Sequence, residues 1–96
     1  MVSRKMDAIV VNEKDNVAVV LRNVKPCEKI VVLMGDKTLE IVAKDFVKRG
    51  HKIALKDIRC GDSIVKYGEV IGIATKDIKR GQHVHVHNVK SARIGE

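Results

Sequence analysis

The chain has 96 residues, with 19 lysines and arginines against 12 aspartates and glutamates, so its formal net charge is +7. This length suits one domain with a modest core, and we expect a single domain over residues 1–96. The two aromatic side chains, Phe46 and Tyr67, are too few for a protein that binds single-stranded nucleic acid by stacking bases. No apolar run approaches the roughly 20 residues of a transmembrane helix, which excludes a helical membrane protein.

The first residues and the two cysteines indicate an intracellular chain. Residues 1–6 carry charges with no apolar stretch behind them, so we expect no signal peptide. Cys27 and Cys60 are too few and too far apart for a disulfide framework or a zinc knuckle, which favours two free thiols. We therefore expect a cytoplasmic protein with no membrane partner.

Short runs of β-branched residues, each bounded by turn residues, predict strands along most of the chain. These runs cover residues 8–11, 17–21, 30–34, 53–55 and 64–65. The one ambiguous stretch is 38–49, where Leu39, Val42 and Phe46 could share a helix face, but the alternation of apolar residues favours a strand followed by a turn. The pattern predicts a mostly all-β fold of short strands and wide turns, with little helix.

A short unit recurs four times. An Asp or Asn is followed by an apolar residue at +1, a turn residue at +4 and an apolar residue at +7, starting at Asn23, Asp57 and Asp77, and at Asp45 in a copy longer by one residue. We expect each acidic side chain to cap backbone N–H groups of its own turn, and the neighbour, Phe46 in the longer copy, to fill the core. Where the turn residue is glycine, it should supply a positive φ. Four units are too few for a solenoid, so we expect a compact, mostly antiparallel β-fold.

Three of the four histidines stand together in His83-Val84-His85-Val86-His87. Side chains two residues apart on a strand share a face, so we expect the three imidazoles on one face and the two valines packed on the other. Neighbouring imidazoles about 7 Å apart can converge on one divalent ion, but all three would need a bend. The alternation slightly favours a metal or anionic-substrate site over a solvent-facing strand that is rich in histidine.

Two further motifs offer polar groups. His51 and Lys52 follow Gly50 at a predicted turn, where they could bind a carboxylate or phosphate, although a solvated turn is the favoured interpretation. Tyr67 follows Lys66 and could donate a hydrogen bond or transfer a proton through its phenol. On the residues alone, a ring over a β-turn at the rim of the core is the favoured role for this tyrosine.

The basic residues are scattered along the chain, and acidic residues interrupt them, mainly at the turns. A nucleic-acid surface usually shows a concentrated basic stripe, so we expect no nucleic-acid partner. The net charge is either an ordinary basic surface or a field that attracts anionic sugar acids or an acidic partner subunit.

Five segments occur in an order that resembles one family: 15–18, 50–55, 57–58, 66–72 and 81–88. Together they resemble the N-terminal SAF domain, of β-clip fold, in the altronate and galactarate dehydratases. The small subunit of sulfolactate sulfo-lyase is similar over the same stretch, and the His-Val-His-Val-His-Asn segment resembles the altronate and sulfolactate branches more than the galactarate branch. The resemblance implies a core over about residues 7–88 and a short tail over 89–96.

The resemblance implies a carbon–oxygen lyase acting on a polyhydroxy acid, which loses a proton α to its carboxylate and a leaving group from the β carbon. The family is associated with a divalent metal, so we expect Fe²⁺, with Mn²⁺ or Zn²⁺ as alternatives. The implied roles are metal binding by His85 and His87, catalysis by His51, Tyr67 and Lys66, and substrate binding by Lys52, Asn88 and His83.

Complete dehydratases of this family are far longer than this chain. We therefore expect a small subunit or N-terminal-type domain that is inactive alone and whose active site is completed by a large catalytic subunit. The alternatives from other classes are a non-catalytic carbohydrate- or anion-binding SAF module and the small subunit of a sulfolactate sulfo-lyase. A homo-oligomer is a further open alternative.

Overall fold

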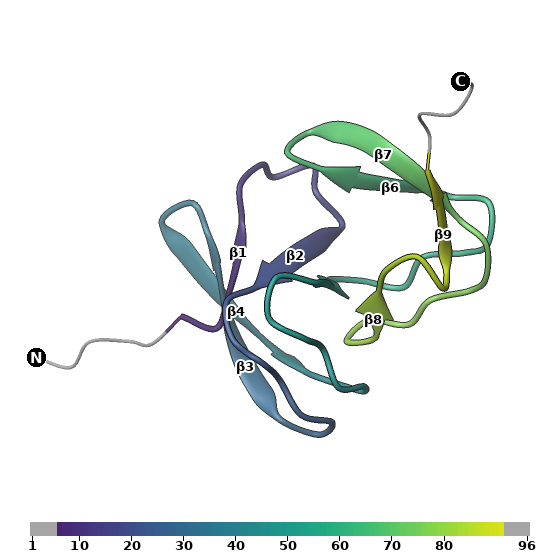
Figure 1. Ribbon diagram of the computed structural model, residues 1–96. Coiled ribbons are helices and arrows are strands. Elements are labelled where there is room, and N and C mark those ends of the chain that lie inside the picture. Colours follow the sequence, from purple (N-terminus) through teal and green to yellow (C-terminus); the bar gives the residue numbers. More distant parts are fainter. Residues whose placement is uncertain (1–5, 92–96) are drawn as a thin grey trace, which may run out of the picture.

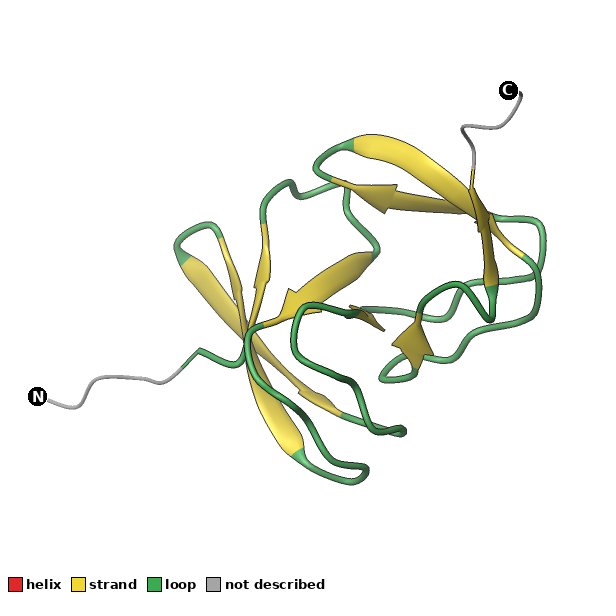
Figure 2. Cartoon of the chain, viewed as in Figure 1, coloured by secondary structure: helices red, strands yellow, loops and turns green. Residues whose placement is uncertain are grey.

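The computed structural model describes residues 6–91, which form nine strands and no helix (Figures 1 and 2). The strands are β1 (Ala8–Val10), β2 (Val17–Val20), β3 (Lys29–Met34), β4 (Lys37–Val42), β5 (Lys52–Ala54), β6 (Ser63–Lys66), β7 (Glu69–Ala74), β8 (His83–Val84) and β9 (Val89–Ser91). The prediction of an all-β fold is confirmed. Within the described residues, no helix is long and apolar enough to span a membrane. Residues 1–5, on which the signal-peptide expectation depends, and residues 92–96 of the expected tail lie outside the described part.

All five β-branched runs form strands, and β4 occupies the ambiguous stretch as a strand followed by a turn. Two strands escaped prediction. Gly72 interrupts the apolar pattern of β7, and a glycine inside a strand weakens the sequence signal. β9 lies in the segment expected to be a tail, and its three residues form a strand through pairing with β7, which the local sequence does not encode.

The first sheet has six strands in the order β4-β3-β1-β2-β5-β8. Every neighbouring pair in it is antiparallel except β1 with β3, as expected for a mostly antiparallel fold. Its buried cluster is made of aliphatic side chains, so the shortage of aromatic residues leaves no gap in the core. The largest fully buried members are Ile30, Ile53, Val20, Val24, Val32 and Val47.

The second sheet has three strands in the order β6-β7-β9, and it covers a second buried cluster. Strands β2 and β5 of the first sheet contribute side chains to both clusters. Ala18 and Ile53 belong to the first cluster, whereas Val17 and Ala54 belong to the second, because neighbouring residues of a strand point to opposite faces. The two clusters therefore share a wall, and β8 is paired to that wall through β5.

The four repeated units are turns that pair two by two. Backbone bridges join Val24 to Val47 and Ile58 to Ile78, and all four side chains are buried. The turn glycines have a positive φ, as predicted, with Gly50 at 87°, Gly61 at 95° and Gly81 at 91°, and Cys27 at the same position has one as well, at 72°. The repeat therefore encodes two paired turns, and each pair closes one side of a buried cluster.

Two details of the repeat prediction are wrong. Phe46 does not fill the core in the longer copy, since its side chain is 49% exposed and Val47 is buried instead. The extra residue of that copy therefore lies between Asp45 and Val47. The acidic side chains also do not cap their own turns: Asp57 Oδ1 accepts the Arg80 N–H of the partner turn at 2.9 Å.

The second pair of turns caps itself reciprocally, because Asp77 Oδ1 likewise accepts the Cys60 N–H at 2.8 Å. Pairing places each acidic side chain opposite free N–H groups of the other turn, and these distant donors replace the local ones that an Asx-turn would use. In three of the four turns a different position supplies the local cap: Glu28 accepts from Lys25, Asp62 from Arg59, and Gln82 from Lys79.

Candidate metal centre

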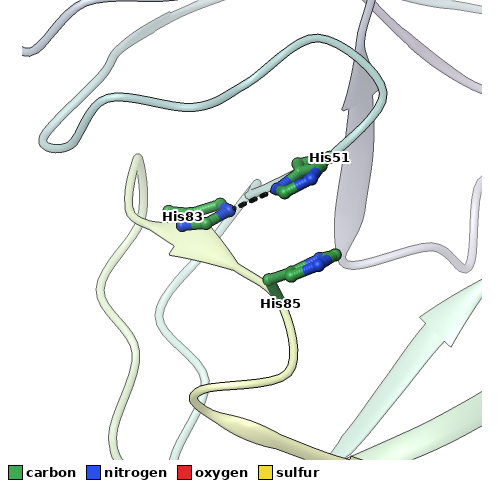
Figure 3. A group of neighbouring side chains, drawn as sticks. All are labelled: His51, His83 and His85. Atoms are coloured by element: carbon green, nitrogen blue, oxygen red, sulfur yellow. Dashed lines mark hydrogen bonds between the residues drawn. The ribbon is translucent and has the colours of Figure 1, made fainter.

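Three histidines from two distant segments meet at the end of the first sheet (Figure 3). His51 ends the second repeated turn, just before β5, while His83 begins β8 and His85 follows it. Antiparallel pairing of β5 with β8 sets Ile53 opposite His83, which brings the two segments side by side. The rings of His51 and His85 stack with centroids 3.8 Å apart, and those of His51 and His83 with centroids 5.1 Å apart.

The ring nitrogens of this group lie close enough together to share one metal ion. His51 Nδ1 lies 2.8 Å from His83 Nε2, and one ligand nitrogen from each of His51, His83 and His85 lies within 4.8 Å of the others. His85 Nδ1 is buried and has no hydrogen-bond partner among the described residues. A buried polar atom without a partner costs free energy, and a divalent cation bound through imidazole nitrogens at about 2.0–2.1 Å would satisfy it. The three residues therefore fit a metal.

The electrostatics of the group favour neutral imidazoles, the form that binds metals. Burial is the main cause that lowers the pKa of His83, with smaller contributions from His87, His51 and His85, while Asp45 acts weakly in the opposite direction. Burial also lowers the pKa of His85, helped by the neighbouring His51, Lys52 and His87.

The predicted alternation beyond Val84 is wrong. β8 ends at Val84, and Val86 is 81% exposed instead of packing on the core. The chain turns over at this point because the buried Asn88 side chain accepts the His85 N–H at 3.0 Å and donates to the His83 carbonyl at 2.9 Å. Because β8 is only two residues long, the segment bends after Val84. His83 and His85 then lie on either side of this bend and both approach His51.

The structure places Asn88, His87 and His83 differently from the expected roles. Asn88, expected to bind substrate, holds the turn that follows β8. His87, expected to bind metal with His85, is exposed and stands outside the group of three, although its ring lies 4.9 Å from that of His83. His51 and His83 occupy the place beside His85 that His87 was expected to take.

Asp45 supports the group through a departure from the repeat. In the second pair, each acidic side chain accepts an N–H of the other turn. By the same pattern, Asn23 Oδ1 accepts the Arg49 N–H at 2.8 Å, and the Asp45 carboxylate would accept the N–H of residue 26. Position 26 is Pro26, which has no N–H to donate. Asp45 Oδ2 instead accepts the His83 N–H at 3.0 Å, so the displaced cap anchors a candidate metal ligand.

His51 is a second departure from the repeat. It stands where the other three units carry the capping side chains of Glu28, Asp62 and Gln82. The His51 N–H donates to the Lys48 carbonyl at 2.8 Å, so the turn closes through its backbone and the imidazole is available for the histidine group. A comparison of the four units could have indicated this role from sequence.

Lys52 lies near His85, and Lys66 lies near Lys52. Burial lowers the pKa of Lys52, and the charge of Lys66 lowers it further. Lys52 and His85 line one side of a cavity of about 170 Å³, and the remaining lining residues are Ile71, Val86, Val89 and Ser91. The Lys66 ammonium lies 4.8 Å from the centre of the Tyr67 ring, and Tyr67 is exposed.

A loop for which the sequence predicted no role fixes the hairpin formed by β6 and β7. The buried Asp15 accepts the Gly68 N–H through Oδ1 at 2.8 Å. Asn16 accepts the Val65 N–H through Oδ1 at 2.8 Å and donates to the Ser63 carbonyl at 2.9 Å. The two side chains therefore hold both ends of the segment that carries the candidate residues Lys66 and Tyr67.

Comparisons with known proteins point to one family. The family model described as the altronate/galactarate dehydratase SAF domain matches residues 6–92. The chain is 46% identical over 83 residues to altronate dehydratase of Bacillus subtilis, which covers 86% of this chain and 16% of that protein. It is 41% identical over 86 residues to altronate dehydratase of Escherichia coli, which covers 90% of this chain and 17% of that protein.

A shorter relative is matched over nearly its whole length. The chain is 41% identical over 63 residues to (2R)-sulfolactate sulfo-lyase subunit alpha of Paracoccus pantotrophus, covering 66% of this chain and 94% of that subunit. The chain thus spans about a sixth of the altronate dehydratases that it matches, but nearly the whole of this named subunit.

Proposed function

Because the chain belongs to the SAF-domain family of the altronate and galactarate dehydratases, we propose that it works in a sugar-acid hydro-lyase of the altronate dehydratase type. In this proposal it is a small subunit or N-terminal-type domain. It contributes metal- and substrate-binding residues to an active site that a larger catalytic polypeptide completes. The observation that carries the proposal is the convergence of His51, His83 and His85.

The three imidazoles are proposed to hold one divalent cation, Fe²⁺ or alternatively Mn²⁺ or Zn²⁺, metals to which imidazole nitrogen is suited. Such a cation acts as a Lewis acid on carboxylate or hydroxyl oxygens and stabilises the negative charge that develops when a proton α to a carboxylate is removed. Asp45 and Asn88 are positioning residues, because they hold the backbone of His83 and His85 rather than their rings.

Lys52 and Lys66 are proposed to attract the substrate carboxylate. Among residues 6–91 the ion pairs join Arg22 to Asp7 and Glu28, and Lys29 to Glu40, so neither of these lysines has its charge offset by such a pair. The lowered pKa of Lys52 reflects the cost of holding this charge half-buried, and a bound carboxylate would offset that cost. Tyr67, at the tip of the adjoining hairpin, is proposed as a hydrogen-bond donor or proton shuttle.

Metal titration of the purified chain tests the first part of the proposal. Isothermal titration calorimetry with Fe²⁺ under anaerobic conditions, and with Mn²⁺ and Zn²⁺, should reveal one site per chain. His51→Ala and His85→Ala should each weaken it by more than the 10–100-fold typical of outer-shell changes, because each removes a ligand. His87→Ala is the matched control, since this ring lies outside the group, and it should change affinity only slightly.

The outcome that contradicts the metal proposal is clear. A wild-type chain that binds none of the three cations would remove the metal centre, as would unchanged affinity in both His51→Ala and His85→Ala. A loss confined to His87→Ala would restore the site expected from sequence, which paired His87 with His85.

Turnover tests the second part. We expect no dehydration of an aldonic acid such as altronate by the purified chain alone, because one small β-domain offers a single candidate face. Addition of the altronate-dehydratase-type catalytic polypeptide of the same organism should give activity, and Lys52→Met should reduce it mainly through a higher KM. Turnover by the chain alone would overturn the shared active site.

The length match favours a second candidate, the small subunit of a sulfolactate sulfo-lyase. Both candidates use a carboxylate substrate with a leaving group at the β carbon, so the same histidines and lysines would serve either one. Assay of the assembled protein with altronate and with (2R)-sulfolactate separates them, because the first yields water and the second yields sulfite.

A further inference from the structure

An exposed apolar surface adjoins the histidine group. Val86, 81% exposed, is the most exposed of the large apolar side chains in residues 6–91. Ile71 of β7 and Val89 of β9, which are partly buried against the second cluster, line one cavity with Val86, and the other lining residues are Lys52, His85 and Ser91. We call the three apolar side chains the Val86 surface.

The exposure of Val86 is imposed by its surroundings. Asn88 closes the turn with bonds to His85 and His83, and the Asn88 N–H donates to the His85 carbonyl at 3.2 Å. Val86 thus projects from the tip of a turn that is fixed at its base. A rigid apolar side chain loses little conformational entropy on binding, which suits it to anchor an interface.

The charge beside this surface defines what can cover it. Lys52 is half-buried at the cavity, and the ion pairs of the described residues involve other side chains. Lys52 is proposed to hold the substrate carboxylate, so a partner that covers the cavity gains by placing an apolar side chain on Val86 and leaving the Lys52 charge to the substrate. A substrate rich in hydroxyl groups is a poor match for a wall made of Ile71, Val86 and Val89.

We infer that the Val86 surface docks the catalytic polypeptide through an apolar side chain. This inference rests on the proposed function, and it explains why the histidine group lies beside an apolar wall. The altronate dehydratases that match this chain are about six times its matched length, so a large body of protein exists in these relatives to cover the surface. Docking there would shield the open side of the histidine group from water and strengthen its electrostatic interactions.

Association with the altronate-dehydratase-type catalytic polypeptide of the same organism tests the inference. Affinity is measured by biolayer interferometry for the wild type, Val86→Gln and Val11→Gln. Val86→Gln should weaken association by about tenfold or more, because it removes an apolar contact from the centre of the interface. Val11 is the matched control: it is 63% exposed and also lies outside a strand, but it does not line the cavity, so Val11→Gln should bind like the wild type.

A second measurement separates docking from metal binding. Hydrogen exchange should show slower exchange of the amides of residues 85–89 when the catalytic polypeptide is added. Val86→Gln should bind metal like the wild type in the absence of the catalytic polypeptide, because it alters no ring nitrogen. Equal affinity of Val86→Gln and the wild type would overturn the docking surface alone, whereas absence of any association would overturn the shared active site of the proposed function as well. A wild-type chain that associates with the catalytic polypeptide but binds no metal would overturn the metal proposal alone.

Discussion

The two pairs of repeated turns share one backbone plan, but only one pair is self-contained. In the second pair, Asp57 and Asp77 cap each other's turns. In the first pair, Asn23 caps its partner turn, but the return bond is missing because Pro26 has no N–H. Asp45 is thereby redirected to His83.

The first pair also lacks the standard residue at two other positions. Cys27 stands where the other units have glycine at a positive φ, and His51 stands where they have a capping side chain. The symmetric pair has only structural bonds, whereas the pair that departs from the repeat supplies both His51 and the anchor of His83. Departures from an internal repeat thus indicate where function has replaced a purely structural role.

The largest effect is expected where the two pairs touch, at Gly81. A Cβ added there would lie 2.4 Å from the Val42 carbonyl oxygen, and the Gly81 carbonyl accepts the Lys44 N–H at 2.8 Å. Gly81→Ala therefore combines an unfavourable φ of 91° with a backbone clash, and should lower the free energy of unfolding by about 3 kcal/mol. Chemical denaturation measures this.

Gly61 is the control for that change. Its φ of 95° is equally unfavourable for alanine, but nothing lies within 4 Å of the added Cβ. Gly61→Ala should therefore cost only the conformational term, about 1–2 kcal/mol. Equal losses in the two variants would show that the first and second pairs are not tightly packed at this contact.

The next prediction separates the anchoring of His83 by Asp45 from the capping of a turn by Asp57. Asp45→Ala removes the acceptor of the His83 N–H, so His83 should lose its fixed position and metal affinity should fall by about tenfold. Asp57→Ala removes an equivalent cap from the symmetric pair. Both should lower the free energy of unfolding by about 1 kcal/mol, but only Asp45→Ala should weaken metal binding in a calorimetric titration.

The conservative variant Asp45→Asn sharpens this result. Its amide oxygen can still accept the His83 N–H, so it should recover most of the metal affinity that Asp45→Ala loses. If Asp57→Ala weakens metal binding as much as Asp45→Ala does, the loss reflects general destabilisation, and Asp45 is not a positioning residue.

These contrasts also show what the sequence could predict. Most strands, the four turns and the positive φ of their glycines follow from local patterns, because β-branched runs and turn residues act through neighbouring atoms. The bonds of Asp45 and Asp57 to distant N–H groups do not, because pairing of the turns decides which donors come within reach.

The candidate site shows the same division. The sequence identified all of the histidines that gather, but it assumed that a strand continued to His87. The chain turns at His85 because Asn88 offers its backbone a better set of hydrogen bonds, and such a local competition is not visible in an alternation of His and Val. His51 joins the group only through pairing of β5 with β8.

A smaller effect is expected at the position where the first pair carries Cys27 instead of glycine. Its φ of 72° costs a non-glycine residue about 1–2 kcal/mol. Glycine removes this cost, but its larger entropy in the unfolded state cancels part of the gain in stability. Cys27→Gly should therefore raise the free energy of unfolding by about 0.5 kcal/mol. Cys60 is also exposed and free but lacks a positive φ, so Cys60→Gly should lower stability instead. A gain in both variants would contradict strain at Cys27.

The smallest effect concerns Glu28, which occupies in the first turn the position that His51 occupies in the second. A hydrogen bond from Arg22 lowers the pKa of Glu28 below its ordinary value of 4.5, helped by the bond from the Lys25 N–H. Because the folded pKa is the lower one, the unfolded chain binds more protons in acid. The stability that Glu28 contributes is therefore present above pH 4.5 and lost as pH falls through the folded pKa.

Glu28→Gln keeps a side-chain oxygen for the cap, as Gln82 does in the fourth turn, but removes the charge that pairs with Arg22. Urea denaturation should show the variant slightly less stable than the wild type at pH 7, and the difference should shrink as the pH falls below 4.5 and through the folded pKa. Glu40→Gln is the control, since that carboxylate lies 3.8 Å from Lys29 and caps no turn. A difference that stays constant with pH would mean that Glu28 acts through its cap alone, and the first turn would then resemble the third and fourth more closely than its ion pair suggests.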